Sequence, residues 1–208
     1  MSESHRDGTK SRLSISRRSI LKSLGMGVAA SSVLRVIPLQ AAEHAHHMVA
    51  TEKAASPAKA YAPKYFSAHQ YKTLQQLCQT IFPADSDSGG AVEAGAPEFI
   101  DLLTSENHEY QQILGGGVMW LDNTCVDRYD KLYLDCPPGQ QKEILDKIAY
   151  RKNAVSDASL SQGVEFFSFL RKMTADGFFT SEIGIKYLGY IGSAYLTEFP
   201  GCPAVPEA

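Results

Sequence analysis

Apolar side chains recur at spacings of three and four residues over much of the chain after residue 66. The clearest run begins at Ser67 and Gln70, whose residue types and spacing form a capping box at a helix start. The apolar positions of that run are Tyr71, Leu74, Leu77, Cys78 and Ile81, and Pro83 follows them. This pattern predicts an amphipathic helix that begins after Ser67 and ends before Pro83.

The pattern predicts further helices in the middle of the chain. Pro97 is expected to begin a short helix, because proline is favoured in the first turn. A following helical stretch is expected to be interrupted at Gly115-Gly116-Gly117. The longest helix should then cover residues 118–132, until Pro137-Pro138-Gly139 ends it.

Three more helices are indicated in the last third of the chain, over residues 140–151, 164–173 and 181–190. No stretch shows the period-two alternation that is typical of a half-buried strand. The sequence therefore predicts an all-α fold, a compact single domain of six or seven helices.

Residues 1–41 differ from everything after them. They hold seven basic side chains against two acids, and an apolar run from Leu24 to Leu34 follows the basic cluster. This is the layout of an export signal peptide. A membrane span is the alternative, but a span needs about 20 apolar residues, and this run is about half that length. Cleavage near Ala41 or Ala42 is therefore expected.

The basic cluster contains a more specific motif. Arg17, Arg18, Leu21 and Lys22 match the twin-arginine consensus, together with the serine before the arginine pair, while Ile20 stands where phenylalanine is usual. The twin-arginine route exports proteins that have already folded. The predicted localisation is the periplasm. Residues 42–64, rich in Ala, Lys, His and Pro, are interpreted as a flexible linker, and residues 65–208 as the helical domain.

The net charge of the chain argues against some classes of binding partner. The whole chain has a net charge of −3, and residues 1–41 are strongly basic, so the remainder is markedly acidic. An acidic surface disfavours binding to nucleic acid or to an anionic membrane.

The domain offers few groups for catalysis. After residue 60 its only histidines are His69 and His108, each among polar neighbours, and both are interpreted as solvated surface residues. The glycine triplet at residues 115–117 lacks the spacing of a nucleotide-binding loop, so a flexible joint is the preferred interpretation. No catalytic, cofactor-binding or metal-binding residue is predicted.

Two segments resemble metal sites only in part. The loop that starts at Asp85 departs from the calcium-binding pattern at Gly89 and at Ala96. His44, His46 and His47 could bind a transition metal incidentally in the linker.

The four cysteines are Cys78, Cys125, Cys136 and Cys202. In an oxidising compartment they could form disulfides. Cys78 and Cys125 fall on apolar helix faces and are interpreted as buried thiols. Cys136 and Cys202 adjoin prolines in loops and are the better disulfide candidates, and a bridge from Cys202 to another chain is a further hypothesis.

Several segments, taken in order, resemble the gluconate 2-dehydrogenase subunit 3 family. They are the helix end at 77–83, Gly95-Ala96-Pro97-Glu98-Phe99-Ile100-Asp101, the aromatic stretch 166–171, Gly177-Phe178-Phe179-Thr180-Ser181 and Gly201-Cys202-Pro203. The resemblance covers about residues 65–204.

The resemblance implies a small, non-catalytic subunit of a periplasmic dehydrogenase for sugars, glycosides or sugar acids. The large subunit, of the glucose-methanol-choline oxidoreductase type, would hold FAD, and a cytochrome c would accept electrons. The small subunit would escort the large one through the twin-arginine route, and the complex could associate with the membrane through a partner. Candidate partner-facing residues, with core packing as the alternative, are Phe178, Phe179, Tyr187, Tyr190 and Tyr195.

Two other functions remain open on the residues alone. One is a stand-alone periplasmic ligand-binding module, which would need a defined pocket, and the other is a metal-dependent enzyme. The subunit hypothesis instead requires exposed apolar surface on the isolated chain.

Overall fold

The structure is a computed structural model and describes residues 37–58 and 60–191. Regular structure in this part of the chain is entirely helical, so the all-α prediction is confirmed. None of its helices has both the length and the apolar character needed to cross a bilayer. The α-helices are α2 (Leu39–Ala55), α3 (Ala68–Ile81), α4 (Ala96–Glu106), α5 (His108–Tyr110), α6 (Gly116–Tyr129), α7 (Pro138–Ile148), α8 (Arg151–Ser156), α9 (Ser161–Phe179) and α10 (Glu182–Tyr187).

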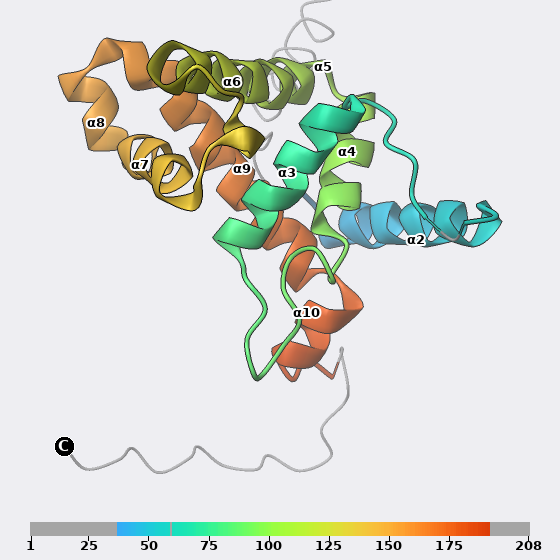
Figure 1. The fold of residues 1–208 in the computed structure, drawn as a ribbon. Helices are drawn as coiled ribbons and strands as arrows, with labels where there is room; N and C mark the ends of the chain where they lie inside the picture. The colour runs from blue at the N-terminus through green and yellow to red at the C-terminus, as the bar shows by residue number, and fades with distance from the viewer. Residues whose placement is uncertain (1–36, 59, 192–208) are drawn as a thin grey trace, which may run out of the picture. The chain divides into compact units, whose positions relative to one another are not determined.

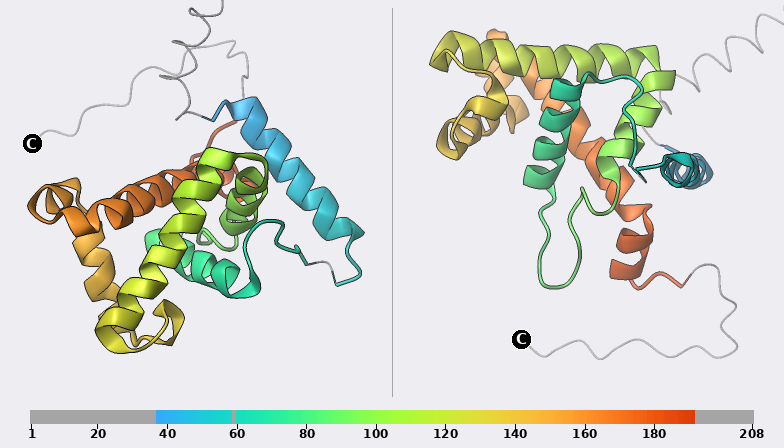
Figure 2. Two further views of the ribbon diagram at one scale, coloured as in Figure 1. Left: turned by 90° about the horizontal axis from the view of Figure 1, so that it is seen from above. Right: turned by 45° about the vertical axis from the view of Figure 1, so that its right-hand side comes forward.

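Helix α9 is the centre of the domain. It packs against α3, α4 and α6 along its length, and Figures 1 and 2 show these helices gathered around it. Helix α10 follows its C-terminal end, while α7 and α8 lie toward its N-terminal end (Figure 1). The core side chains of α9 include Phe166, Leu170, Met173 and Phe178, all almost fully buried. Burial of these large apolar groups provides most of the driving force for assembling the domain.

The starts of α3 and α4 follow the sequence closely. Ser67 accepts a hydrogen bond from the Gln70 backbone N–H, and the Gln70 side chain accepts one from the Ser67 N–H, so the predicted capping box is present. Helix α4 begins after Gly95, whose φ of 78° is accessible to glycine at little cost, with Pro97 in the first turn. Both helices therefore start where local chemistry predicts.

The predicted break at the glycine triplet is wrong. A single turn of π-helix, Gln111–Gly115, continues directly into α6, so residues 115–117 are helical. A Cβ at Gly117 would overlap the Phe166 ring, and one at Gly115 would overlap the Tyr65 hydroxyl. These glycines let neighbouring segments approach the helix backbone and do not form a flexible joint.

The boundaries of the next helices also differ from prediction. Helix α6 ends at Tyr129, where Asp130 adopts a left-handed conformation with φ of 54°. Pro138 does not end that helix; it lies in the first turn of α7. The longest helix of the described residues is α9, with 19 residues, and not the predicted 118–132 helix.

The interpretation of residues 42–64 as a flexible linker is corrected by helix α2. This helix covers Leu39–Ala55 and crosses the predicted boundary at residue 41. Its buried side chains are Ala42, Ala45 and Val49, which are too small to give a strong amphipathic pattern. The helix is stabilised by contacts with the rest of the domain, which the local sequence does not reveal.

Those contacts join α2 to α4 and to the end of α9. The His46 ring stacks on Phe99 with centroids 4.9 Å apart, and its Nε2 lies 3.0 Å from the Thr180 hydroxyl. Lys53 forms an ion pair with Glu98, with the nitrogen and oxygen 2.7 Å apart. Helix α2 therefore belongs to the packed domain.

Replacing His46 with glutamine is expected to make stability less dependent on pH. Burial lowers the pKa of His46 below its usual 6.5, and a hydrogen bond to the Gly177 backbone only partly opposes this. As the pH falls through about 6.5, the unfolded chain binds a proton that the folded chain resists, so the wild type loses stability. Denaturant unfolding across this pH range should show a smaller loss for H46Q. Equal losses in both proteins would contradict this assignment.

Asp101 organises the segment that connects α2 to α3. Its carboxylate is fully buried in α4 and accepts hydrogen bonds from the backbone N–H groups of Lys64, Tyr65 and Phe66, at 2.6, 3.2 and 3.0 Å. The Tyr61 hydroxyl donates a fourth, at 2.8 Å, and burial followed by this carboxylate raises the pKa of Tyr61. One side chain therefore holds residues 61–66 against α4.

Candidate functional site

Helix α10 is firmly fixed to the end of α9. The Ser181 hydroxyl accepts a hydrogen bond from the Gly184 N–H at 3.0 Å and donates one to the Phe178 carbonyl at 2.7 Å. Gly184 is buried, and a Cβ there would overlap the Phe178 carbonyl. The sharp turn between α9 and α10 is thus set by side-chain capping and by close backbone packing.

The C-terminal end of α10 is closed by a Schellman motif. Gly189 has φ of 64° and donates its N–H to the Lys186 carbonyl, while the Tyr190 N–H bonds to the Ile185 carbonyl. This is the pairing that ends many helices at a left-handed glycine. It fixes the backbone of the next residues, so their side chains project from an anchored turn.

Four consecutive or near-consecutive apolar side chains around this motif are exposed. We define the α10 patch by these residues and their exposed fractions: Tyr187 (48%), Leu188 (58%), Tyr190 (54%) and Ile191 (75%). Exposed apolar groups that are clustered on rigid backbone are typical of protein-binding surfaces, whereas singly scattered ones need no explanation.

The predicted partner-facing residues separate into two groups. Phe178 is fully buried and stacks on Phe82 with centroids 4.1 Å apart, so core packing, the alternative for these residues, holds for Phe178. Phe179 is half-buried and meets the Phe82 ring edge-on at 5.5 Å. Tyr187 and Tyr190 are exposed, and Leu188 and Ile191, which no pattern in the sequence marks, extend the same surface.

A polar rim lies beside the α10 patch. A surface hollow of about 590 Å³ is lined by Ile183, Lys186 and Tyr187 on the helix and by residues 87–89 of the facing loop. An apolar centre flanked by polar groups is the usual anatomy of a protein–protein interface. The loop is ordered by Asp85, whose Oδ1 accepts the N–H groups of Asp87 and Ser88, and these bonds lower the pKa of Asp85.

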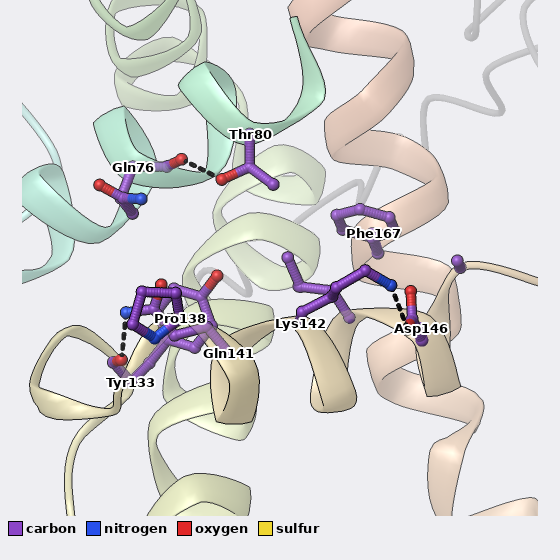
Figure 3. A pocket seen from close by; sticks show the side chains of 10 residues that line it. Gln76, Thr80, Tyr133, Pro138, Gln141, Lys142, Asp146 and Phe167 are labelled. Atoms are coloured by element: carbon purple, nitrogen blue, oxygen red, sulfur yellow. Dashed lines mark hydrogen bonds and ion pairs between the residues drawn. The ribbon is translucent and has the colours of Figure 1, made fainter. Parts of the chain in front are cut away.

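A second hollow lies between α3 and α7 (Figure 3). Its volume is about 390 Å³. Several of its polar groups are already paired: Lys142 with Asp146, the Gln141 amide with the Tyr133 carbonyl, and the Thr80 hydroxyl with the Gln76 carbonyl (Figure 3). The walls are lined by Gln76, Thr80, Tyr133, Pro138, Gln141, Lys142, Leu145, Asp146, Ala149 and Phe167. The paired groups leave few sites to orient a polar ligand.

The histidines have structural partners. The Nε2 of His69 lies 2.8 Å from Asp122, and the other oxygen of that carboxylate accepts the Tyr133 N–H at 3.1 Å. His108 lies 3.2 Å from the Gln112 amide. Within residues 37–58 and 60–191 no three metal-ligating side chains gather into a site. His44, His46 and His47, which lie on helix α2, are therefore not part of such a site among these residues.

The structure describes only some of the residues that the cysteine and leader predictions concern. Cys136 is buried and is a free thiol in this structure, as are Cys78 and Cys125. Cys202 and Tyr195 lie outside the described residues, and so do Arg17, Arg18, Leu21 and Lys22 of the export motif. The disulfide hypotheses for Cys136 and Cys202, whose partners the sequence leaves open, and the role of the leader remain predictions.

Comparison with known proteins gives one finding. The family model described as gluconate 2-dehydrogenase subunit 3 matches residues 68–201. No curated protein and no solved structure matches the chain. The match begins at the first residue of α3 and includes Asp101 and the α10 patch, whereas the residues that donate hydrogen bonds to Asp101 precede it.

Proposed function

The chain belongs to the gluconate 2-dehydrogenase subunit 3 family, and from this premise we propose that it is a non-catalytic subunit and export escort of an FAD-dependent periplasmic dehydrogenase. Family membership itself implies a heteromeric dehydrogenase complex with other subunits. The substrate class in this proposal is a sugar, a glycoside or a sugar acid. FAD is held by a large subunit of the glucose-methanol-choline oxidoreductase type, and a cytochrome c accepts the electrons.

The α10 patch is the observation that carries the partner role. It exposes Tyr187, Leu188, Tyr190 and Ile191 on backbone fixed by the Ser181 cap and the Gly189 turn. A rigid surface loses little conformational entropy on binding, so more of the apolar contact energy is available for affinity. Tyrosine is also among the residue types enriched at interface hot spots.

The escort role joins the leader to the folded domain. The twin-arginine motif of Arg17, Arg18, Leu21 and Lys22 directs export of folded proteins. A flavoprotein that acquires FAD in the cytoplasm must cross the membrane folded. A small folded subunit that binds it and carries the signal would satisfy that requirement.

Introducing two charges into the α10 patch is expected to separate this chain from its flavoprotein. In the double variant L188E/I191E, each carboxylate would have to lose its hydration in the interface, which opposes binding. Binding to the proposed large flavoprotein subunit should weaken by about 30-fold or more, the scale of an interface hot spot. Co-purification and a measured Kd for the two subunits would test this.

Val155→Glu is the matched control. Val155 is 90% exposed on α8, outside the α10 patch, so V155E adds a charge to an exposed apolar site without changing the proposed interface. Its Kd should equal that of the wild type, and circular dichroism should show all three proteins folded. Wild-type affinity in L188E/I191E, or an equal loss in V155E, would contradict this position for the interface.

A further inference from the structure

Two buried cysteines meet where α6 packs against the segment that follows it. Cys125 lies in α6 and is fully buried, and Cys136 follows the short 3₁₀ turn Tyr133–Asp135 with 4% of its surface exposed. Asp122, one helical turn before Cys125, accepts the Tyr133 N–H at 3.1 Å. This hydrogen bond holds the turn against the face of α6 that bears Cys125.

The Cys136 side chain affects the ionisation of Cys125. Burial raises the pKa of Cys125, and the nearby Cys136 raises it further. Burial, followed by the charges of Cys125 and Cys136, also raises the pKa of Tyr133, whose buried hydroxyl has no hydrogen-bond partner among the described residues. Together with the Tyr133–Asp122 hydrogen bond and the burial of all three residues, this places Cys125, Cys136 and Tyr133 in one region of the core.

The third described cysteine lies elsewhere. The Cys78 sulfur in α3 is 3.6 Å from the Thr174 hydroxyl of α9, which provides it with a polar partner. The neighbours of Cys125 instead include Cys136, Tyr133 and the Asp122 carboxylate. Thus the structure distinguishes one cysteine pair from a solitary buried thiol.

We propose that Cys125 and Cys136 form an intramolecular disulfide in the exported protein. The inference rests on the proposed function in one respect, since export would bring the chain into an oxidising compartment. The choice of Cys125 and Cys136 as partners comes from the packing described above. The backbone at Cys136 is held in place, because its N–H bonds to the Tyr133 carbonyl at 3.2 Å and Pro137 follows it before α7. The fold therefore holds the backbone on either side of Cys136, and a disulfide requires two backbone segments that are held close together.

The bond forms by exchange with a disulfide donor, either a protein disulfide or a small-molecule one. The Cys136 thiolate attacks one sulfur of the donor and releases one donor thiolate. The Cys125 thiolate then attacks the mixed disulfide at Cys136 and releases the second donor thiolate. The two protons lost by the cysteines pass to the two donor thiolates, so the donor is reduced by two electrons and the protein is oxidised by two.

Entry of the donor requires local opening of the segment before Cys136. Asp130 has a positive φ, which is uncommon for a residue other than glycine, and Leu132 is 39% exposed. Such segments open more readily than packed helices. The closed disulfide would join α6 to the start of α7, beside the hollow in Figure 3.

The test uses the purified full chain with oxidised glutathione as the disulfide donor. After alkylation in denaturant without reductant, mass spectrometry of the digest should show a Cys125–Cys136 linked peptide. Cys78 should be alkylated, and C78A should form the same link. The oxidised protein should unfold about 5–10 °C above the reduced one, because a short loop is closed in the unfolded chain.

Alkylation of both Cys125 and Cys136 after oxidation would overturn the inference, and so would a link from either of them to Cys78 or Cys202. C136S separates the bond from a general effect of oxidation, because it should show no rise in Tm with oxidised glutathione. These measurements use no partner and no export. A failure of the disulfide is therefore distinguishable from a failure of the proposed function.

Discussion

Replacing Asp101 with alanine is expected to lower the free energy of unfolding by about 3–5 kcal/mol, because several buried donors lose their acceptor together. The carboxylate accepts three backbone N–H groups, from residues 64, 65 and 66, and the Tyr61 hydroxyl. Asp101 is fully buried, so water does not readily replace the lost oxygens. Urea denaturation followed by circular dichroism would measure the change.

Two further variants test whether the loss of stability is specific to the buried Asp101 carboxylate. D101N keeps one amide oxygen as an acceptor and should fall between the wild type and D101A. D127A removes an exposed aspartate of α6 and should change stability by less than about 0.5 kcal/mol. A loss below about 1 kcal/mol in D101A would show that residues 61–66 do not depend on this carboxylate.

The role of Asp101 could not be predicted from the sequence. Asp101 closes the stretch Gly95–Asp101 that carries the family resemblance, yet the pattern of apolar positions gives it no role. In the sequence, Asp101 stands out as an acidic residue among Phe99, Ile100 and Leu102, the apolar residues of α4. Its partners lie about 35–40 residues away in the chain, and only the fold brings them to it.

Elements with strong local signals were predictable. Helix α3 has a capping box and large apolar residues at regular spacing, and α4 has Gly95 and Pro97 at its start. Helix α2 has neither, because it packs through two alanines and a valine and through His46 and Lys53. Its helical state depends on α4 and α9, so local pattern indicated a linker.

The glycine triplet was misinterpreted for a related reason. Glycine lowers helix propensity, so three in succession predict a break. In the structure the gain from close packing outweighs that cost, since Phe166 and Tyr65 occupy the space that side chains at Gly117 and Gly115 would fill. Sequence alone does not show which partner approaches a glycine.

The sequence could predict which region of the chain holds the candidate partner surface, but not which residues of that region are exposed. Phe178 and Tyr187 are both aromatic and nine residues apart, and their rings are 6.3 Å from centroid to centroid. Phe178 is nevertheless buried on the inner side of the turn between α9 and α10, and Tyr187 is 48% exposed. The chain turns at Ser181, between these two residues, and this turn gives them their different exposure. The direction of the turn is set by the close packing of Gly184 against the Phe178 carbonyl.

Changing Arg17 and Arg18 together to lysine is expected to stop export of both this chain and its flavoprotein. The twin-arginine pathway recognises the arginine pair itself, so the substitution retains charge but loses the signal. Nearly all periplasmic dehydrogenase activity should disappear. Arg6 and Arg12 changed to lysine form the matched control, because they lie in the same basic segment outside the motif.

The most direct test of the central claim is the location of the flavoprotein when it is co-expressed with the R17K/R18K variant. Immunoblots and FAD content of periplasmic and cytoplasmic fractions would be compared with those of the wild type and of R6K/R12K. The account predicts folded, FAD-loaded flavoprotein retained in the cytoplasm with R17K/R18K alone. Normal amounts of flavoprotein in the periplasm with that variant would contradict the claim that this chain carries its partner across the membrane.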